Sequence, residues 1–123
     1  MTFDQLAAIA TAIVESTQRR LPTAVREAAM GVPVSFEPFP NDALVEDGLD
    51  PDILGLFVGT EHPGITGEMA LLPPQILLFL ENIRDFAEGD RGIYQDEVRL
   101  TYLHELGHYL GWSEAEIERR GLE

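Results

Sequence analysis

The chain has 123 residues, 45% of them hydrophobic, and its mean hydropathy is −0.04. These values predict a single globular domain over residues 1–123, with enough length for one core and too little for two. Eight arginine and lysine residues against 22 acidic residues give a net charge of −14, which disfavours nucleic acid and anionic membranes as partners. The same charge favours a basic peptide or protein, although acidity that only aids solubility is the alternative.

No apolar run approaches the roughly 20 residues of a membrane span. Residues Met1–Gln5 lack the positive stretch of a signal peptide, so the expected compartment is the cytoplasm. The chain contains no cysteine, which excludes disulfides and thiolate ligands. A metal ion would therefore have to be held by histidine and carboxylate side chains.

The first part of the chain predicts two helices and a strand. Hydrophobic residues recur at helical spacing over residues 3–20, and a shorter helix is expected at Thr23–Met30. Val32–Phe36 alternates apolar and polar residues, as a strand does. Residues 37–52 are rich in proline and acidic residues and predict a loop, with a turn of helix at Asp42–Glu46.

Two apolar strands are expected in the middle of the chain. Ile76–Leu80 is apolar on both faces and follows two prolines, so it predicts a central strand. Ile53–Val58 suits either an internal strand or an edge strand, and as an edge strand it could bind a substrate peptide as an additional strand. Glu68–Leu72 is a further short candidate. The loop before it contains His62, which is either a donor to a polarised carbonyl or simply solvated.

Helices dominate the last third of the chain. Glu81–Glu88 predicts one helix, Gly89–Gly92 a break, and residues 94–110 a long helix. A last helix is expected over residues 114–121. On the long helix three leucines share one side, which predicts the face that packs on the core: Leu103, Leu106 and Leu110.

The long helix contains the motif His104-Glu105-Leu106-Gly107-His108. Residues four apart lie on the same side of a helix, so both histidines can direct an imidazole nitrogen at one ion. Zn²⁺ accepts such nitrogens at about 2.0–2.1 Å. Glu105 projects roughly 100° around the helix, where its carboxylate can reach a water on the metal without binding the metal itself.

A catalytic zinc site needs a third protein ligand and one open position. Gly111 follows His108 by three residues, and Glu114 follows by three more, at the offset of the third ligand in the extended zincin pattern. Glycine suits the place where the helix stops and the chain turns back. Glu114 is the favoured ligand, with Glu116 and Glu118 as alternatives.

Further residues in and near the motif have predicted roles of their own. Glu97 falls at the angular position of the histidines, together with Thr101, and could hydrogen-bond a ligand histidine or remain a solvated surface carboxylate. Gly107 costs about 1 kcal/mol of helix propensity relative to alanine, which predicts a close approach by a neighbouring backbone. Ser113 and Glu116 form an S-x-x-E capping box for the last helix.

The run from His104 to Glu114 resembles the zincin metallopeptidases. The whole chain resembles a small bacterial family of minimal zincin-like domains that are described as candidate zinc metallopeptidases. The other matching segments are Leu21–Pro22, Ile53–Gly59 and Leu72–Ile76. The resemblance implies an α+β fold that binds zinc and, less directly, peptidase activity.

This sequence departs from the family pattern at two places. Tyr109 stands where the family often has another histidine directly after the motif. The loop that begins Thr60-Glu61-His62-Pro63-Gly64 lacks the basic residue that the family tends to carry there.

Together these features predict an α+β, zincin-like domain in which a mixed sheet of three or four strands packs against the first helix and the motif helix. The favoured function is a zinc-dependent peptidase: His104, His108 and Glu114 hold Zn²⁺, and Glu105 takes a proton from the metal water and passes it to the leaving amine. Two alternatives are a non-catalytic, metal-stabilised peptide-binding module and a chain that binds no metal.

Overall fold

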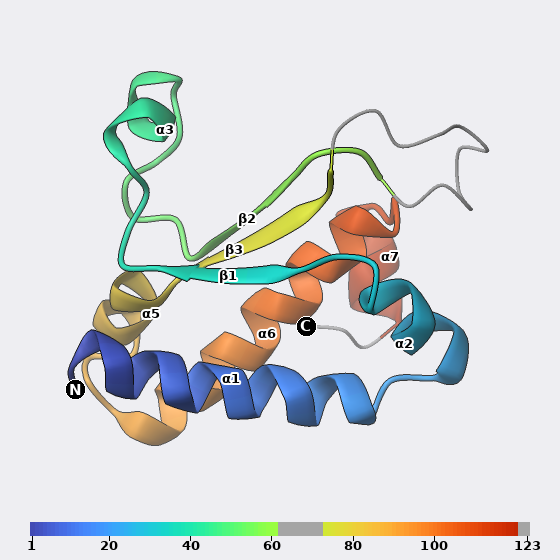
Figure 1. Ribbon diagram of the computed structural model, residues 1–123, viewed down its shortest axis with the longest axis horizontal. Coiled ribbons are helices and arrows are strands. Elements are labelled where there is room, and N and C mark those ends of the chain that lie inside the picture. The colour runs from blue at the N-terminus through green and yellow to red at the C-terminus, as the bar shows by residue number, and fades with distance from the viewer. Residues whose placement is uncertain (62–72, 121–123) are drawn as a thin grey trace.

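The computed structural model describes residues 1–61 and 73–120. Over these residues helices begin and end the chain, the strands lie between them, and the fold is α+β (Figure 1). The elements are α1 (Phe3–Arg19), α2 (Thr23–Ala29), β1 (Val34–Glu37), α3 (Asp42–Glu46), β2 (Gly55–Val58), β3 (Gln75–Phe79), α5 (Leu80–Phe86), α6 (Arg91–Tyr109) and α7 (Glu114–Arg119).

The described strands form one mixed sheet in the order β1-β3-β2. β1 runs parallel to β3, with Val34 opposite Ile76, and β2 runs antiparallel to β3, with Gly55 opposite Leu78. The central position predicted for the apolar strand is therefore confirmed. Among the strands of residues 1–61 and 73–120, β2 lies at an edge, which agrees with the edge position of the two that were left open for Ile53–Val58.

Helix α6 joins the sheet to the N-terminal helix. It contacts β2 and β3 on one side and α1 on the other, while α5 also packs on both α1 and α6 (Figure 1). The hydrophobic periodicity of α1 and α6 places their apolar faces in this common core. Fully buried side chains in the core include Leu6, Ala10, Ile76, Leu78, Ile83, Val98, Tyr102 and Leu106.

Helix α6 starts earlier than its sequence suggests. The predicted break at Gly89–Gly92 is wrong for its second half, because Asp90 caps the helix: its side chain accepts a hydrogen bond from the Ile93 N–H at 2.9 Å. Arg91 and Gly92 are thereby included in the first turn. No helix in the part of the chain that the structure describes is both long and apolar enough to cross a membrane.

The remaining boundaries differ by a few residues. β1 begins two residues later than expected, since Pro33 has no N–H to contribute to strand pairing. β2 begins at Gly55 rather than Ile53, and α7 ends at Arg119. The strand expected at Glu68–Leu72 and the loop histidine His62 lie outside the described residues.

The buried tyrosine of α6 gives a prediction about alkaline stability. The Tyr94 hydroxyl donates a hydrogen bond to the Leu6 carbonyl at 2.9 Å, and burial raises the pKa of Tyr94 above its usual value of 10.0. Above pH ~10 the unfolded state therefore holds fewer protons than the folded state, and stability falls as the pH rises.

Tyr94→Phe should lower the free energy of unfolding by about 1 kcal/mol at neutral pH, because one hydrogen bond is lost. It should also make the decline in stability above pH ~10 shallower, because one ionisable group with a raised pKa is gone. Urea unfolding at about pH 7 and about pH 10.5 measures both effects. Equal declines in the variant and the wild type would contradict the assignment.

Candidate metal centre

Helix α6 carries His104 and His108 on the side away from the core. Their side chains are 30% and 36% exposed, whereas Leu103 and Leu106 are buried. The two imidazole rings lie with their centroids 4.8 Å apart and nearly edge to face. The helix therefore has the apolar face and the histidine face that its sequence predicts.

The chain reverses directly after this helix. Gly111 has a φ of +77°, and two hydrogen bonds close the turn, from the Gly111 N–H to the His108 carbonyl at 2.9 Å and from the Trp112 N–H to the Gly107 carbonyl at 3.0 Å. These are the bonds of a Schellman motif, and only glycine takes its left-handed position without a steric penalty. The turn returns the chain towards the histidine face.

Glu114 opens α7 immediately after this turn. Its Oε1 lies 3.1 Å from His104 Nε2 and 3.2 Å from His108 Nε2, although the side chain is 65% exposed. Ligand atoms at about 2.0–2.2 Å from a tetrahedral zinc stand roughly 3.3–3.5 Å apart. The two nitrogens and the oxygen are thus spaced as ligands of one small ion are. The same distances also suit hydrogen bonds from histidine N–H groups to a carboxylate. The metal content of the purified protein distinguishes a metal site from such a hydrogen-bonded cluster.

Helix α7 packs against α6 where its buried side chain, Ile117, lies on Gly107. A Cβ at Gly107 would come within 2.5 Å of Ile117 Cγ1, and Ile117 is completely buried. The predicted close approach at Gly107 therefore exists, but it is made by a side chain and not by a neighbouring backbone. This contact sets the distance between the two helices and so the position of Glu114.

The alternative ligands of α7 are placed differently. The Glu116 carboxylate binds Arg120 at 2.7 Å and also binds Arg119. Since it is engaged there, the expected capping box is only half formed: the Ser113 side chain accepts from the Glu116 N–H at 3.2 Å, with no return bond from Glu116. Glu118 is exposed and makes no ion pair within the described residues.

Glu105 lies on the other side of the histidine pair, facing strand β2. It is only 9% exposed, and its Oε1 accepts a hydrogen bond from the Phe57 N–H at 2.9 Å. Burial raises the pKa of Glu105, while His108, His104 and the Phe57 N–H partly offset this effect. Because Phe57 fixes this carboxylate, Glu105 is the less suitable of the two nearby carboxylates as a metal ligand, although its ligand atom and those of both histidines lie within 4.8 Å of one another.

A glycine in β2 allows this approach. A Cβ at Gly55 would come within 2.6 Å of Thr101 Cγ2 and 3.3 Å of Glu105 Cγ, so any larger residue would push the strand away from α6. The role of Gly55 and that of the Phe57 N–H were not predicted from the sequence. The signal was a glycine inside an apolar strand, which often marks a close approach of backbones.

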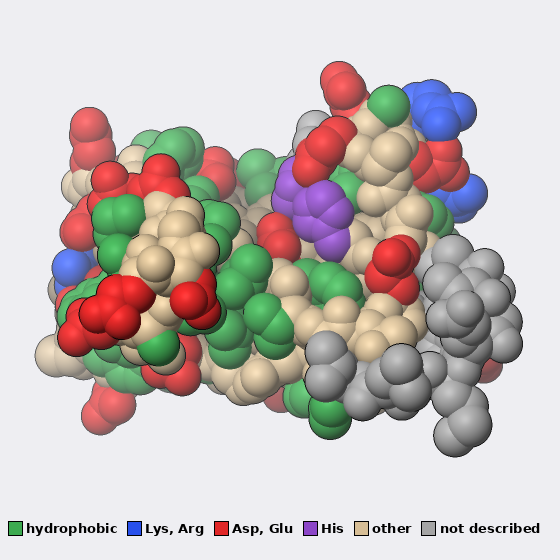
Figure 2. Space-filling view, turned by 90° about the horizontal axis from the view of Figure 1, so that it is seen from above, with side chains coloured by type: hydrophobic (Ala, Val, Ile, Leu, Met, Phe, Trp, Pro, Cys, Tyr) green, Lys and Arg blue, Asp and Glu red, His purple; other side chains and the backbone are tan. Residues whose placement is uncertain are grey.

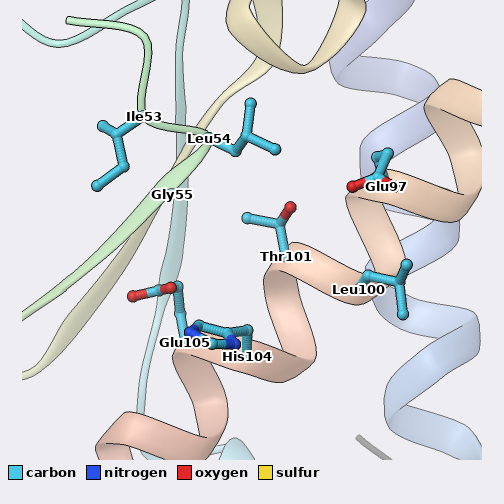
Figure 3. A pocket seen from close by; sticks show the side chains of 8 residues that line it. All are labelled: Ile53, Leu54, Gly55, Glu97, Leu100, Thr101, His104 and Glu105. Carbon is cyan, nitrogen blue, oxygen red and sulfur yellow. The ribbon is translucent and has the colours of Figure 1, made fainter. Parts of the chain in front are cut away.

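Two hollows meet at His104 and Glu105. One, of about 710 Å³, runs from Ile53 and Gly55 past Glu105 and His108 to Trp112 and Ser113. The other, of about 440 Å³, extends towards the N-terminal end of α6 and is shown in Figure 3. Figure 2 shows the histidine side chains (purple) exposed on this face, beside hydrophobic side chains (green). The candidate centre is therefore open to a ligand from both directions.

Glu97 and Thr101 do not support the histidines directly. Within the described residues the Glu97 carboxylate forms no hydrogen bond with His104, and Figure 3 shows it at the opposite end of the smaller hollow. Thr101 is buried beneath Gly55. The interpretation of Glu97 as a partner of a ligand histidine is therefore wrong, because it lies two helical turns away.

Tyr109, the departure from the family pattern, belongs to the core side of α6. It is 3% exposed, and its ring packs against Phe57 with the centroids 5.7 Å apart. One residue beyond His108, the helix has rotated by about 100°, so this position faces the sheet. A histidine is therefore not needed here to complete the candidate centre.

The geometry defines a class of fold: a helix with the H-E-x-x-H motif lies beneath the edge strand of the described mixed sheet, and a carboxylate follows a glycine turn. A family model described as zincin-like metallopeptidase matches residues 29–122. The chain belongs to this family. No curated protein matches it.

Replacing Glu114 tests the third ligand. Mutation of a residue that only hydrogen-bonds a metal ligand typically lowers metal affinity by about 10–100-fold. Removal of a direct ligand should cost more, so Glu114→Ala should weaken zinc binding by at least about 100-fold. Glu118→Ala is the matched control, since it removes the same charge from the same exposed helix. Competition with a chelating dye measures the affinity, and elemental analysis measures the zinc content. Wild-type affinity in Glu114→Ala would show that this carboxylate is not a ligand.

Replacing Gly107 tests the contact that positions α7. In Gly107→Ala the new Cβ displaces Ile117, so zinc affinity should fall even though alanine favours the helix by about 1 kcal/mol. Gly92→Ala, in the same helix, is the control, because there a Cβ meets only Asp90 Oδ1 at 3.4 Å. The zinc affinities of both variants are measured by titration. Equal affinities would mean that the contact between Gly107 and Ile117 does not position Glu114.

Proposed function

We propose that the chain is a zinc-dependent metallopeptidase, with His104, His108 and Glu114 as zinc ligands and Glu105 as catalytic base. The observation that carries this proposal is the position of Glu114 Oε1, within 3.2 Å of both histidine Nε2 atoms. Two nitrogens and one carboxylate oxygen are a donor set that hydrolytic zinc sites use. Membership of the zincin-like metallopeptidase family supports the same proposal.

These donors fit zinc in number, kind and spacing, and the hollows beside them leave room for water and substrate. A zinc ion bound there supplies a Lewis acid that lowers the pKa of a water towards ~7 and polarises a peptide carbonyl. The absence of cysteine restricts the ligands to histidine and carboxylate, as in several hydrolytic enzymes.

Glu105 moves the proton in the proposed reaction. As the water oxygen bonds to the carbonyl carbon, Glu105 accepts a proton from that water, and when the C–N bond breaks it gives the proton to the leaving amine. The hydrogen bond from the Phe57 N–H engages Oε1 and leaves Oε2 for this transfer. The raised pKa of Glu105 brings it closer to neutral pH, where such transfers are efficient.

Strand β2 provides a surface for the peptide backbone. The Phe79 N–H binds the Leu54 carbonyl at 2.9 Å, so by the alternation of an antiparallel pair the backbone groups of Gly55 and Phe57 point away from β3. The Phe57 N–H is engaged by Glu105, and a peptide strand added here would use the remaining groups of this edge. A peptide or protein substrate, favoured to be basic by the net charge, and a cytoplasmic location stay predictions.

Glu105→Gln tests catalysis separately from metal binding. Glutamine keeps the acceptor for the Phe57 N–H but cannot take up a proton, so turnover should be abolished while zinc remains bound. The wild type and the variant are incubated with casein and with a peptide library, with and without a chelator, and the zinc content of each is measured. Undiminished, metal-dependent cleavage by Glu105→Gln would refute the role of Glu105. A wild type that binds zinc and peptides but cleaves none would be the non-catalytic binding module.

A further inference from the structure

The smaller of the two hollows combines apolar walls with a carboxylate at each end, Glu105 beside His104 and Glu97 at the far end. Three half-buried hydrophobic side chains line it, from Ile53, Leu54 and Leu100. His104 and Glu105 stand at one end, and Glu97 stands at the other (Figure 3). We call this space the Glu97 hollow. Its position means that a molecule held at the histidine pair has direct access to it.

Glu97 is a carboxylate that the fold itself does not use. Within residues 1–61 and 73–120 no arginine or histidine pairs with it, and the chain contains no lysine. Burial beside the apolar walls, and then repulsion from Asp96, raise the pKa of Glu97. A negative charge placed against hydrophobic side chains without a partner is costly, and a bound cation would remove that cost.

The dimensions of the hollow select a long side chain. Glu97 and His104 are seven residues apart on α6, which is roughly 10 Å along the helix axis. A side chain that enters beside the histidines must cross the apolar walls before it reaches the carboxylate. Arginine and lysine have this combination of an apolar stem and a cationic end.

We infer that the Glu97 hollow is a side-chain subsite of the proposed peptidase and that Glu97 makes it select arginine or lysine beside the bond that is cut. This inference rests on the proposed function, because it names the substrate class of the same centre. Many acidic and few basic side chains surround the histidines on this face, which attracts basic peptides from a distance (Figure 2). Glu97 adds a short-range contact, which favours arginine or lysine at the one substrate position whose side chain enters the Glu97 hollow.

The first experiment measures the preference in substrates. Cleavage sites in a proteome-derived peptide mixture are determined by mass spectrometry for the wild type and for Glu97→Gln. The wild type should be enriched in arginine or lysine at one position next to the cut. In a matched pair of peptides, Glu97→Gln should lower kcat/KM for the arginine peptide by about tenfold and leave the norleucine peptide unchanged.

The second experiment does not require turnover. Two dipeptide hydroxamates that differ only in an arginine or a norleucine side chain beside the chelating group are titrated into zinc-loaded wild type, Glu97→Gln and Asp96→Asn. The wild type should bind the arginine probe about tenfold more tightly, and Glu97→Gln should lose this difference. Asp96→Asn removes the same charge from the neighbouring exposed position, which does not line the hollow. This variant should keep most of the difference in affinity between the two probes.

The outcomes separate the two proposals. Metal-dependent cleavage without a basic preference, or a preference that Glu97→Gln retains, would overturn the role of Glu97 and leave the peptidase standing. Preferential binding of the arginine probe without any cleavage would support the hollow and count against the peptidase. If the protein neither cleaves peptides nor binds either hydroxamate, both proposals fail together.

Discussion

The packing of Ile117 on Gly107 is the contact on which the candidate centre depends. Two histidines four apart on α6 can be placed by helix geometry alone, but Glu114 comes from a different helix. Its position depends on how closely α7 approaches α6, and the missing Cβ of Gly107 permits that approach. The left-handed Gly111 determines the direction of the turn. Two glycines thus account for the convergence of three polar side chains.

A second close approach places Glu105. Gly55 allows β2 to lie directly over α6, and the Phe57 N–H then reaches the Glu105 carboxylate. This bond ties the middle of the edge strand to the motif helix. The order β1-β3-β2 matters for the same reason, because an outward N–H is available only at the edge of the sheet. Sheet topology and the proposed acid–base chemistry are therefore coupled through one hydrogen bond.

The sequence predicted the parts of the site that depend on local spacing. The shared face of His104 and His108 follows from the helical repeat, and the turn at Gly111 follows from the motif. The placement of Glu114 near both histidines was expected from its offset after that turn. The α+β class and the central place of β3 followed from hydrophobic patterning.

The parts that depend on contacts between distant elements were not predictable. The partner of Glu105 is 48 residues away in the chain, and a spacing rule cannot identify it. The hollow beside Glu97 is formed by side chains from α6 and from the segment before β2. Its existence therefore depends on where β2 and that segment lie along α6. Asp90 as the cap of α6 was missed because the glycines on either side of it indicated a break.

The brevity of α7 has a consequence for how fast a metal would be exchanged. A helix of six residues has little stability of its own, and this one depends on its cap and on the single buried side chain that anchors it. The two imidazoles lie on a long helix packed in the core, whereas the carboxylate lies on a short helix with one buried side chain, the kind of segment that opens locally at low free energy. In the proposed centre, ion release would begin with local opening of this segment while the paired nitrogens stay in place, so its opening rate would set the lifetime of the loaded state.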